Sequence, residues 1–364
     1  MTDAAASPGE DARWMAHALQ LAARGRLTTR PNPRVGCVLV RAGRNIGEGY
    51  HRRAGEPHAE VHALAAAAEA ARGATAYVTL EPCSHHGRTP PCADALIAAG
   101  VQRVVVAVED PNPQVAGRGI AALRAAGMTV DIGCLAGPAA ALNRGFFSRM
   151  QRGRPWVTLK LAASLDGRTA MASGESQWIS GEAARADVHR QRAEAGAVMV
   201  AAATVLADDP QLTLRPAPDG VAPPDRIVLD ARAEVPAGAR VWADDGARRF
   251  WLTAEPGAAP SGVHRLTVAT RADGRLRLDQ ALAVLAAAEV NAVLVEAGSR
   301  LAGALIDSRL PDELVVYLAP RLLGDAALGM ANLPGLTGLA DAPALRWTDT
   351  RTVGADLRLT AQFI

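Results

Sequence analysis

Residues 58–60 read His-Ala-Glu, residues 82–83 read Pro-Cys, and a further cysteine follows at residue 92. One imidazole and two thiolates suit a tetrahedral zinc ion with one position left for water. Zinc lowers the pKa of such a water molecule to about 7, which makes a nucleophile available at neutral pH. The stretch therefore predicts a zinc site formed by His58, Cys83 and Cys92.

Glu60 follows the histidine by two residues, so its carboxylate can face the same cavity without binding the metal. His-x-Glu combined with Pro-Cys and a further cysteine is the signature of zinc deaminases, in which the glutamate transfers protons. The chain departs from that signature because eight residues, not two, separate the cysteines. A closed structural zinc site is the alternative, with His62, His85 or His86 as a fourth ligand. That alternative gives Glu60 and Pro82 no role, so we favour the catalytic site.

Composition narrows the class of protein. The length of 364 residues exceeds what one ordinary core requires and predicts two domains. The net charge of +2 gives no sign of a polyanionic partner. The N-terminus is acidic and rich in alanine, and no apolar run reaches the ~18 residues of a membrane span. Four cysteines, two of them in the zinc set, do not indicate a disulfide framework. We therefore expect a cytoplasmic protein that binds neither membranes nor nucleic acid.

The first half alternates strands and helices around the expected metal. The predicted helices cover residues 11–24, 57–72 and 91–100, and the predicted strands cover residues 35–40, 76–80 and 101–108. Pro57 fits the first turn of the second helix, which places His58 and Glu60 near its N-terminus. We therefore predict an α/β three-layer domain over residues 10–150, with residues 138–155 as the candidate linker.

The second domain is expected over residues 154–364. Its predicted strands cover residues 156–162, 197–201, 226–230, 250–253, 293–296 and 314–318, and its predicted helices cover residues 182–194 and 301–306. Gly298 precedes the last of these helices. A glycine before a helix N-terminus is a ready phosphate site, although ordinary turns between a strand and a helix share the pattern.

Residues 117–122 read Gly-Arg-Gly-Ile-Ala-Ala and resemble a dinucleotide-binding fingerprint. Such a fingerprint follows its strand directly, whereas residues 111–116, which include two prolines, intervene here. The acidic residue expected about 20 positions further on is also not well placed. We therefore interpret this segment as a loop followed by a packing helix.

Several longer motifs resemble those of the bifunctional deaminase–reductase family of riboflavin biosynthesis. In the first half they are Pro-Asn-Pro at residues 31–33, Gly-Tyr-His at residues 49–51, Gly-Glu-Pro-His-Ala-Glu at residues 55–60 and the whole segment 79–92. The long segment between the two cysteines is typical of this family. In the second half they are residues 160–167, 174–179, 204–210 and 295–298. The resemblance covers nearly the whole chain.

The resemblance implies a cytidine-deaminase-like domain followed by a dihydrofolate-reductase-like domain. It also implies two successive reactions. The first is the hydrolytic deamination of 2,5-diamino-6-(5-phosphoribosylamino)pyrimidin-4(3H)-one. The second is the NADPH reduction of the ribosyl group of 5-amino-6-(5-phosphoribosylamino)uracil to ribityl. The implied cofactors are Zn2+ and NADPH, the implied partners are small phosphorylated pyrimidines, and homo-oligomerisation is left open.

The matching motifs carry expected site residues to this chain. Glu60 would be the acid–base residue of the deaminase. The residues that would hold the deaminase substrate are Asn32, His51, Arg88 and Thr89. The residues that would line the NADPH site are Ala162, Trp178, Thr204, Asp208, Gly298, Ser299, Arg300, Leu301, Ala302, Gly303 and Ala304. The residues that would hold the reductase substrate are Ser176, Arg192, Leu212, Arg215 and Glu296.

Lys160 is the only lysine among 39 Lys and Arg residues. Lysine differs from arginine in being a compact, flexible donor whose pKa falls readily on burial. We hypothesise that Lys160 supplies a proton or a cation to the sugar oxygens when the ribosyl ring opens, with Glu296 or Asp208 nearby. The alternative is a surface lysine without a catalytic role.

Two other classes of protein share part of the pattern. A nucleic-acid deaminase with an accessory domain would require a basic face and stacking aromatic residues. Aromatic residues make up only 4% of this chain, so composition does not favour that class. A non-catalytic zinc-binding module would bind the metal without releasing ammonia, which an assay with and without a chelator separates from an enzyme.

Overall fold

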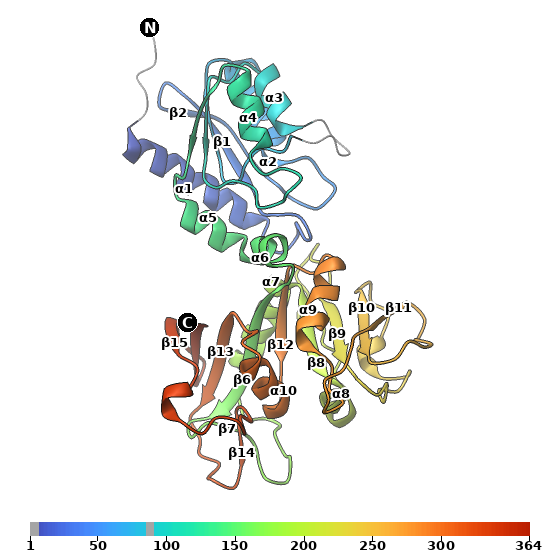
Figure 1. Cartoon of the computed structure of the whole chain (residues 1–364). Coiled ribbons are helices and arrows are strands. Elements are labelled where there is room, and N and C mark those ends of the chain that lie inside the picture. The colour runs from blue at the N-terminus through green and yellow to red at the C-terminus, as the bar shows by residue number, and fades with distance from the viewer. Residues whose placement is uncertain (1–6, 85–90) are drawn as a thin grey trace. The chain divides into compact units, whose positions relative to one another are not determined.

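The computed structural model describes residues 7–84 and 91–364 of the chain. The chain divides into two compact units, Met1–Gly153 and Arg154–Ile364 (Figure 1). Each unit has its own sheet and its own buried apolar clusters. Within the described residues, no helix has both the length and the apolar character needed to span a bilayer.

The N-terminal unit is built on the strands β1 (Gly36–Arg41), β2 (Arg44–Tyr50), β3 (Thr75–Val78), β4 (Arg103–Val106) and β5 (Thr129–Ile132). They form one five-stranded sheet in the order β2-β1-β3-β4-β5. β1 is antiparallel to both of its neighbours, whereas β3, β4 and β5 are parallel. The polypeptide therefore leaves β3 at the same edge of the sheet as β4, and this edge carries Cys83.

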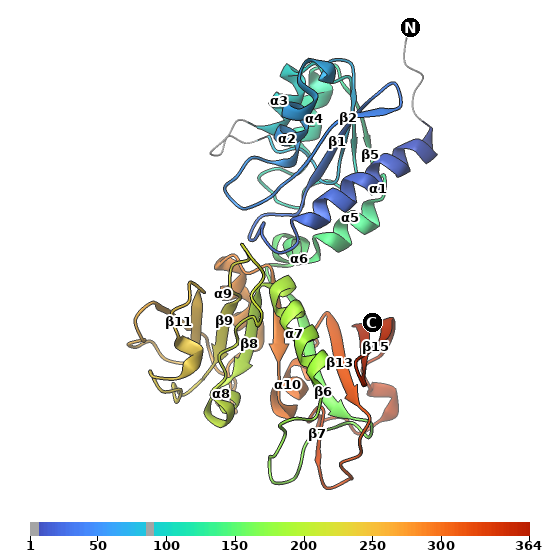
Figure 2. The same cartoon turned by 180° about the vertical axis from the view of Figure 1, so that it is seen from behind.

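Helices cover both faces of this sheet, which gives three layers (Figure 2). The helices on one face are α1 (Pro8–Arg24) and α5 (Ala136–Leu142), and those on the other are α2 (Ala59–Ala67), α3 (Cys92–Ala98) and α4 (Arg118–Ala125). Because strand side chains alternate between faces, Val38 packs with the first group and its neighbour Leu39 packs with the second. The predicted three-layer α/β domain is confirmed.

The second helix differs from its predicted boundaries. It starts at Ala59 rather than Pro57, because His58 is extended, with φ −75° and ψ 170°, and serves as the N-cap. It stops at Ala67 instead of Arg72, and a short 3₁₀ helix, η1 (Ala68–Ala71), follows it. The changed start matters because it places His58 just before the first turn of the helix, at its N-terminus.

The linker predicted at residues 138–155 contains the boundary between the two units, but most of it is helical. The chain there forms most of α5 and then α6 (Arg144–Arg152), which belong to the N-terminal unit. Alanine and arginine both favour helices, and this preference outweighs the breaking effect of the glycine and proline residues. Gly153 ends α6 in the left-handed conformation, with φ 63°.

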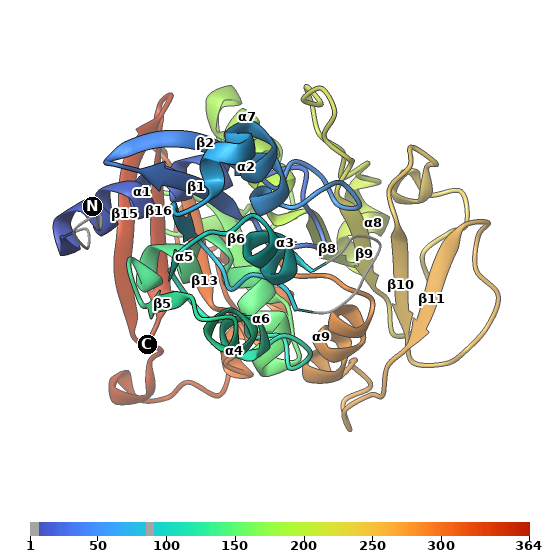
Figure 3. The ribbon, with the colours of Figure 1, turned by 90° about the horizontal axis from the view of Figure 1, so that it is seen from above.

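The strands of the C-terminal sheet are β6 (Trp156–Ser164), β8 (Ala197–Ala201), β9 (Asp225–Leu229), β10 (Arg249–Thr253), β11 (Val263–Thr267), β12 (Ala292–Glu296), β13 (Glu313–Ala319), β15 (Leu345–Val353) and β16 (Asp356–Phe363). Their order is β11-β10-β9-β8-β12-β6-β13-β16-β15, and Figure 3 shows β10 and β11 at one edge of this sheet and β16 and β15 at the other. All neighbours from β11 to β13 are parallel, whereas β16 and β15 complete the sheet as antiparallel strands. A separate two-stranded sheet joins β7 (Arg168–Ala170) to β14 (Leu328–Gly329).

Helices also cover both faces of the C-terminal sheet. The helices on one face are α9 (Leu278–Ala287) and α10 (Ser299–Asp307), and those on the other are α7 (Glu182–Ala195) and α8 (Ala202–Asp208). Leu159 and Leu161 of β6 pack in the cluster beneath α9 and α10. Lys160 lies between them in sequence, so its side chain projects from the opposite face, where α7 lies.

Candidate active sites

Three potential metal ligands meet at the N-terminal ends of α2 and α3. His58 is the N-cap of α2, Cys83 follows β3, and Cys92 is the first residue of α3. Their ligand atoms all lie within 4.8 Å of one another. His58 Nδ1 lies 3.6 Å from Cys83 Sγ and 3.3 Å from Cys92 Sγ. One imidazole and two thiols at these separations fit a tetrahedral zinc ion that keeps one position for water.

The surroundings of Cys83 favour its thiolate form. A hydrogen bond with the Cys92 thiol holds the pKa of Cys83 well below its usual range, and His58 acts in the same direction while burial opposes both. The backbone N–H of Cys92 also lies 3.4 Å from Cys83 Sγ. Because a thiolate is the form that binds metal, this arrangement prepares the ligand before the ion arrives.

In the alternative of a closed structural zinc site, one of three histidines would be the fourth zinc ligand. Among the described residues, the cluster of potential metal ligands consists of His58, Cys83 and Cys92, and His62 is not part of it. The other two candidates, His85 and His86, lie outside the described residues.

Glu60 lies in the first turn of α2 and is only 3% exposed. Burial raises its pKa to about 6, with His58 opposing and Cys83 supporting this rise. Its Oε2 atom has no hydrogen-bond partner within the part of the chain that the structure describes. Buried polar atoms are rarely left unpaired, so this oxygen is available to a molecule that enters the site.

Asn32 and His51 lie beside the metal ligands. The side-chain nitrogen Nδ2 of Asn32 is 3.2 Å from His51 Nε2, and His51 Nδ1 is 3.2 Å from the carbonyl oxygen of Pro57. The His51 ring packs edge-on against the His58 ring, with centroids 5.3 Å apart. Burial lowers the pKa of His51, which favours a neutral ring in this position. Arg88 and Thr89, the other two residues expected to hold the deaminase substrate, lie outside the described residues.

Lys160 and Glu296, both expected to act on the reductase substrate, are direct partners in the register of β6 and β12. Arg192 on α7 forms a bidentate ion pair with Glu296. The Nε–Oε1 distance is 2.5 Å and the Nη2–Oε2 distance is 2.9 Å. Burial opposes ionisation of Glu296, but the charge and hydrogen bonds of Arg192, aided by Lys160, lower its pKa to about 2. The carboxylate is therefore charged at neutral pH.

Lys160 is held in a partly buried position on the same face of the sheet. Burial lowers its pKa, the carboxylate of Glu296 opposes that fall, and the charge of Arg192 adds to it. Its Nζ atom lies 5.8 Å from the centre of the Tyr317 ring on β13. The ammonium thus lies between an anion and an aromatic face, which is a suitable setting for a proton donor.

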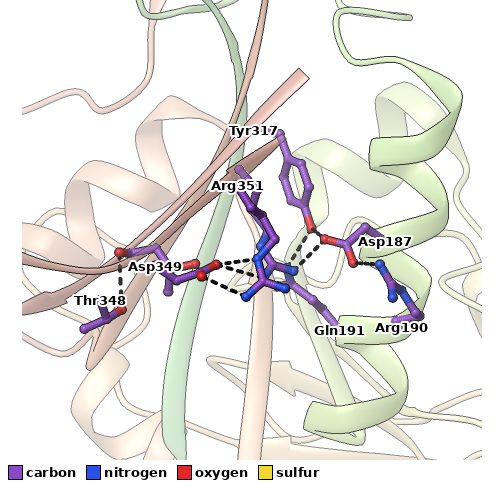
Figure 4. Close-up of polar contacts among 9 residues, drawn as sticks. Asp187, Arg190, Gln191, Tyr317, Thr348, Asp349 and Arg351 are labelled. Carbon is purple, nitrogen blue, oxygen red and sulfur yellow. Dashed lines mark hydrogen bonds and ion pairs between the residues drawn. The ribbon is translucent and has the colours of Figure 1, made fainter. Parts of the chain in front are cut away.

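A polar network that was not predicted from the sequence surrounds the Tyr317 hydroxyl (Figure 4). The buried carboxylate of Asp187 on α7 accepts hydrogen bonds from the Tyr317 hydroxyl at 2.6 Å and from Arg358 Nη1 at 2.8 Å. Arg190 also pairs with Asp187, and Gln191 donates to the Tyr317 hydroxyl. Burial opposes ionisation of Asp187, but these hydrogen bonds outweigh it and lower its pKa. Tyr317 in an apolar strand was the available signal, since a buried hydroxyl requires a partner.

Two further residues expected to bind the reductase substrate lie on the segment that follows α8. Arg192 Nη1 donates to the carbonyl oxygen of Thr213 at 2.8 Å, which ties this segment to α7. Leu212 is buried next to Thr213, whereas Arg215 is exposed. Ser176 lies on the loop between β7 and α7 and is half-buried.

The residues expected to line the cofactor site are distributed over four elements. Trp178 is 62% exposed, and the Arg185 guanidinium lies 4.8 Å from the centre of its ring. Asp208, at the end of α8, accepts a hydrogen bond from Gln177 at 3.0 Å, which joins it to the Trp178 loop. Thr204 on α8 and Ala162 on β6 are both half-buried.

The last expected cofactor segment, residues 298–304, forms the N-terminal part of α10. Gly298 is the N-cap of this helix, and no side chain caps the helix. Free backbone N–H groups at a helix N-terminus suit a phosphate of NADPH. Ser299, Arg300, Leu301 and Ala304 remain at least partly accessible, whereas Ala302 and Gly303 are buried in the core. Side-chain contact with a cofactor is therefore open to the first group only.

Comparison with known protein families covers both units. Residues 8–108 match the family model described as "Cytidine and deoxycytidylate deaminase zinc-binding region". Residues 155–359 match the family model described as "RibD C-terminal domain".

Full-length relatives show the same combination. The riboflavin biosynthesis protein RibD of Escherichia coli strain K12 is 52% identical over 361 residues, which cover 96% of this chain and 98% of that protein. The structure of Acinetobacter baumannii RibD, form 2, superposes with a TM-score of 0.91 at 44% identity and covers 99% of this chain and 100% of that one. A Thermotoga maritima structure described as a diaminohydroxyphosphoribosylaminopyrimidine deaminase/5-amino-6-(5-phosphoribosylamino)uracil reductase gives a TM-score of 0.86 at 33% identity, over 98% of this chain and 99% of that one.

Proposed function

Because the chain belongs to the bifunctional deaminase–reductase family of riboflavin biosynthesis, we propose that the zinc site of its N-terminal unit deaminates the pyrimidine and that the Lys160 site of its C-terminal unit reduces the sugar. The two reactions are those of the family. The first removes the 2-amino group of 2,5-diamino-6-(5-phosphoribosylamino)pyrimidin-4(3H)-one. The second reduces the ribosyl group of 5-amino-6-(5-phosphoribosylamino)uracil to ribityl. The cofactors are Zn2+ for the first domain and NADPH for the second.

The observation that carries the deaminase proposal is a buried carboxylate with a free oxygen beside three metal ligands. His58, Cys83 and Cys92 would hold the zinc ion, which supplies an activated water molecule for attack on the amine-bearing carbon. Glu60 Oε2 would accept one proton of that water and pass it to the ring nitrogen, then take the remaining proton of the added hydroxyl group and deliver it to the departing amine. Burial of Glu60 raises its pKa toward neutrality, where a carboxylate can both take and give a proton.

Asn32 and His51 would orient the pyrimidine in this site. Their mutual contact fixes both side chains beside the metal ligands, because the neutral ring of His51 donates from Nδ1 to the carbonyl oxygen of Pro57 and accepts at Nε2 from Asn32 Nδ2. Arg88 and Thr89 would contact the same substrate, since guanidinium and hydroxyl groups suit phosphate oxygens.

In the reductase, NADPH supplies the hydride, and the residues of this chain would prepare the sugar. Lys160 would protonate the ring oxygen or stabilise negative charge on it as the ribosyl ring opens. Glu296 opposes the effect of burial on Lys160 and so favours the charged ammonium that this role requires. Ser176, Arg192, Leu212 and Arg215 would surround the same substrate, with Arg192 also fixing the position of Glu296.

The NADPH site would lie along the ends of β6 and α8 and at the N-terminus of α10. Ala162, Thr204 and Asp208 would line it, Trp178 would contribute its exposed ring, and the backbone N–H groups after Gly298 would bind a phosphate. Each position has surface available for contact in this structure.

A coupled assay on the purified chain tests the whole proposal. With the diaminopyrimidine substrate and NADPH, we expect release of ammonia followed by loss of the NADPH absorbance. Removal of zinc by a chelator should abolish ammonia release, and renewed zinc should restore it. Reduction of the pre-deaminated substrate should continue in the presence of the chelator. Ammonia release that persists without zinc would contradict the assignment of the deaminase site.

A further inference from the structure

A second buried glutamate lies next to the metal site and takes no part in the proposed chemistry. Glu81 is 3% exposed and precedes Cys83 by two residues. Its Oε2 accepts hydrogen bonds from the backbone N–H groups of Asp110 at 3.1 Å and Gly117 at 3.0 Å. Its Oε1 accepts from Gly119 at 2.9 Å and Ile120 at 3.2 Å. All four donors belong to the loop after β4 and the start of α4.

This arrangement accounts for the glycine pattern at residues 117–122. Gly117 is the N-cap of α4 in the left-handed conformation, with φ 75°, which glycine adopts without strain. A Cβ atom on Gly119 would lie 2.0 Å from the carbonyl oxygen of Pro82, so only glycine permits this close approach. The glycines thus let a helix N-terminus receive an anion, as in nucleotide-binding loops, but the anion here is the carboxylate of Glu81.

The segment that carries Cys83 is fixed on both sides. Before the cysteine, the backbone N–H of Glu81 donates to Val108 at 3.0 Å, and its side chain binds the α4 N-terminus. After it, the carbonyl oxygen of Cys83 accepts from the N–H of Ala93 on α3 at 3.1 Å. Only Pro82, whose φ angle is restricted, separates Glu81 from the ligand.

We propose that Glu81 is a positioning residue for the metal site, which holds Cys83 at the separation from His58 and Cys92 that a tetrahedral ion requires. The inference rests on the proposed zinc site but adds a residue that does not touch the metal. Without the carboxylate, four backbone donors lose their acceptor, and the segment before Cys83 loses its attachment to α4. The cysteine then samples a wider range of positions, which lowers metal affinity.

The test is Glu81→Gln in the full-length chain, because the amide keeps the size of the side chain but directs N–H groups at N–H groups. We expect a chelator to remove zinc at least about 10-fold faster, as outer residues around metal ligands typically affect affinity by 10- to 100-fold. In protein loaded with Co2+, we expect a weakened sulfur-to-cobalt absorption. Reduction of the pre-deaminated substrate should be unchanged, because it takes place in the other unit.

Asp11→Asn is the matched control. Asp11 is another carboxylate of the N-terminal unit, and it joins α1 to Tyr77 and Arg103 by hydrogen bonds of 2.7–2.8 Å. Its loss should lower the thermal stability of this unit while leaving zinc release and the cobalt spectrum unchanged. If Glu81→Gln behaves like Asp11→Asn, with lower stability but normal metal retention, Glu81 is only a stabilising residue and the proposal is wrong.

Gly119→Ala provides a second variant if Glu81→Gln does not fold. It retains the carboxylate but forces a Cβ atom against Pro82, so the same faster zinc release is expected, and normal release would overturn the proposal. These measurements use no substrate and therefore separate the two proposals. A wild-type chain that binds no metal would refute the zinc site itself, whereas normal metal binding in both variants would refute only the role of Glu81.

Discussion

Replacement of Glu296 by glutamine is the most informative perturbation of the C-terminal unit. The side chains of Glu296 and Arg192 are 17% and 11% exposed, and Lys160 lies opposite Glu296 on the neighbouring strand. Glu296→Gln removes the negative charge that two cations share, while the shape of the side chain is kept. Breaking one partner of a buried pair is costly because it leaves an uncompensated charge.

The pKa of Glu296 allows the loss in the free energy of unfolding to be estimated. A fall from the ordinary value of 4.5 to about 2 corresponds to about 3 kcal/mol, at roughly 1.4 kcal/mol for each pKa unit. Loss of one partner from a buried pair typically costs about 3–5 kcal/mol, and the residual exposure here favours the lower end. Because the folded-state pKa is depressed, this stabilisation is fully present above pH 4.5 and is lost as the pH falls toward about 2. At pH 7 the Glu296→Gln variant should therefore lack this entire stabilisation.

Urea denaturation at pH 7, followed by tryptophan fluorescence, measures this loss. Five of the six tryptophans follow residue 154, so the signal reports mainly on the C-terminal unit. The control is Asp279→Asn, which breaks the exposed pair with Arg277, whose side chains are 48% and 54% exposed, and should leave the midpoint unchanged. We also expect lower reductase turnover, because the pKa of Lys160 falls further without the carboxylate. Equal stability of Glu296→Gln and wild type would refute the reasoning.

Four further results are expected. Cys83→Ser or Cys92→Ser should lose zinc in elemental analysis, and full occupancy in both variants would contradict the ligand assignment. Glu60→Gln should retain zinc and reductase activity but deaminate about 10²–10⁴-fold more slowly, so a near wild-type rate of ammonia release would exclude its proton-transfer role. Lys160→Arg should reduce the sugar about 10²-fold more slowly with little change in NADPH affinity, whereas a normal rate would leave the lysine without a catalytic role. Cleavage after Gly153 should give two folded pieces of which NADPH protects only the C-terminal one against heat, and protection of the other piece would reverse the assignment.

The fold class could be predicted because its evidence is local. Short apolar runs mark the strands of both units, and the family motifs lie at their ends. The helices of residues 136–152 are not evident from the sequence because prolines and glycines occur within and beside them, although Pro138 lies in the first turn of α5, where its missing N–H costs nothing. The start of the second helix was misplaced for a related reason. Pro57 can begin a helix, but the extended backbone of His58 begins this one.

The candidate sites were predictable to different degrees. Histidine and two cysteines indicate zinc whatever the fold, and the structure places their ligand atoms within 4.8 Å. Their role in zinc binding stays a prediction, as do the roles of Lys160 and Glu296. The carboxylate of Glu81 could not be found in this way, because its partners are backbone N–H groups that any sequence would offer. Only the close approach of α4 to the strand end reveals them.

Two buried glutamates and one half-buried glutamate of this chain show how hydrogen bonding separates a reactive carboxylate from a supporting one. Glu81 has both oxygens occupied by backbone N–H groups, and Glu296 has both occupied by Arg192. Arg192 keeps the Glu296 carboxylate charged at neutral pH. Glu60 is as buried as Glu81, yet its Oε2 has no partner in the described part of the chain, and burial raises its pKa to about 6. The same side chain therefore fixes a backbone segment in one place, holds a cation pair in another, and is free to exchange protons only beside the metal ligands.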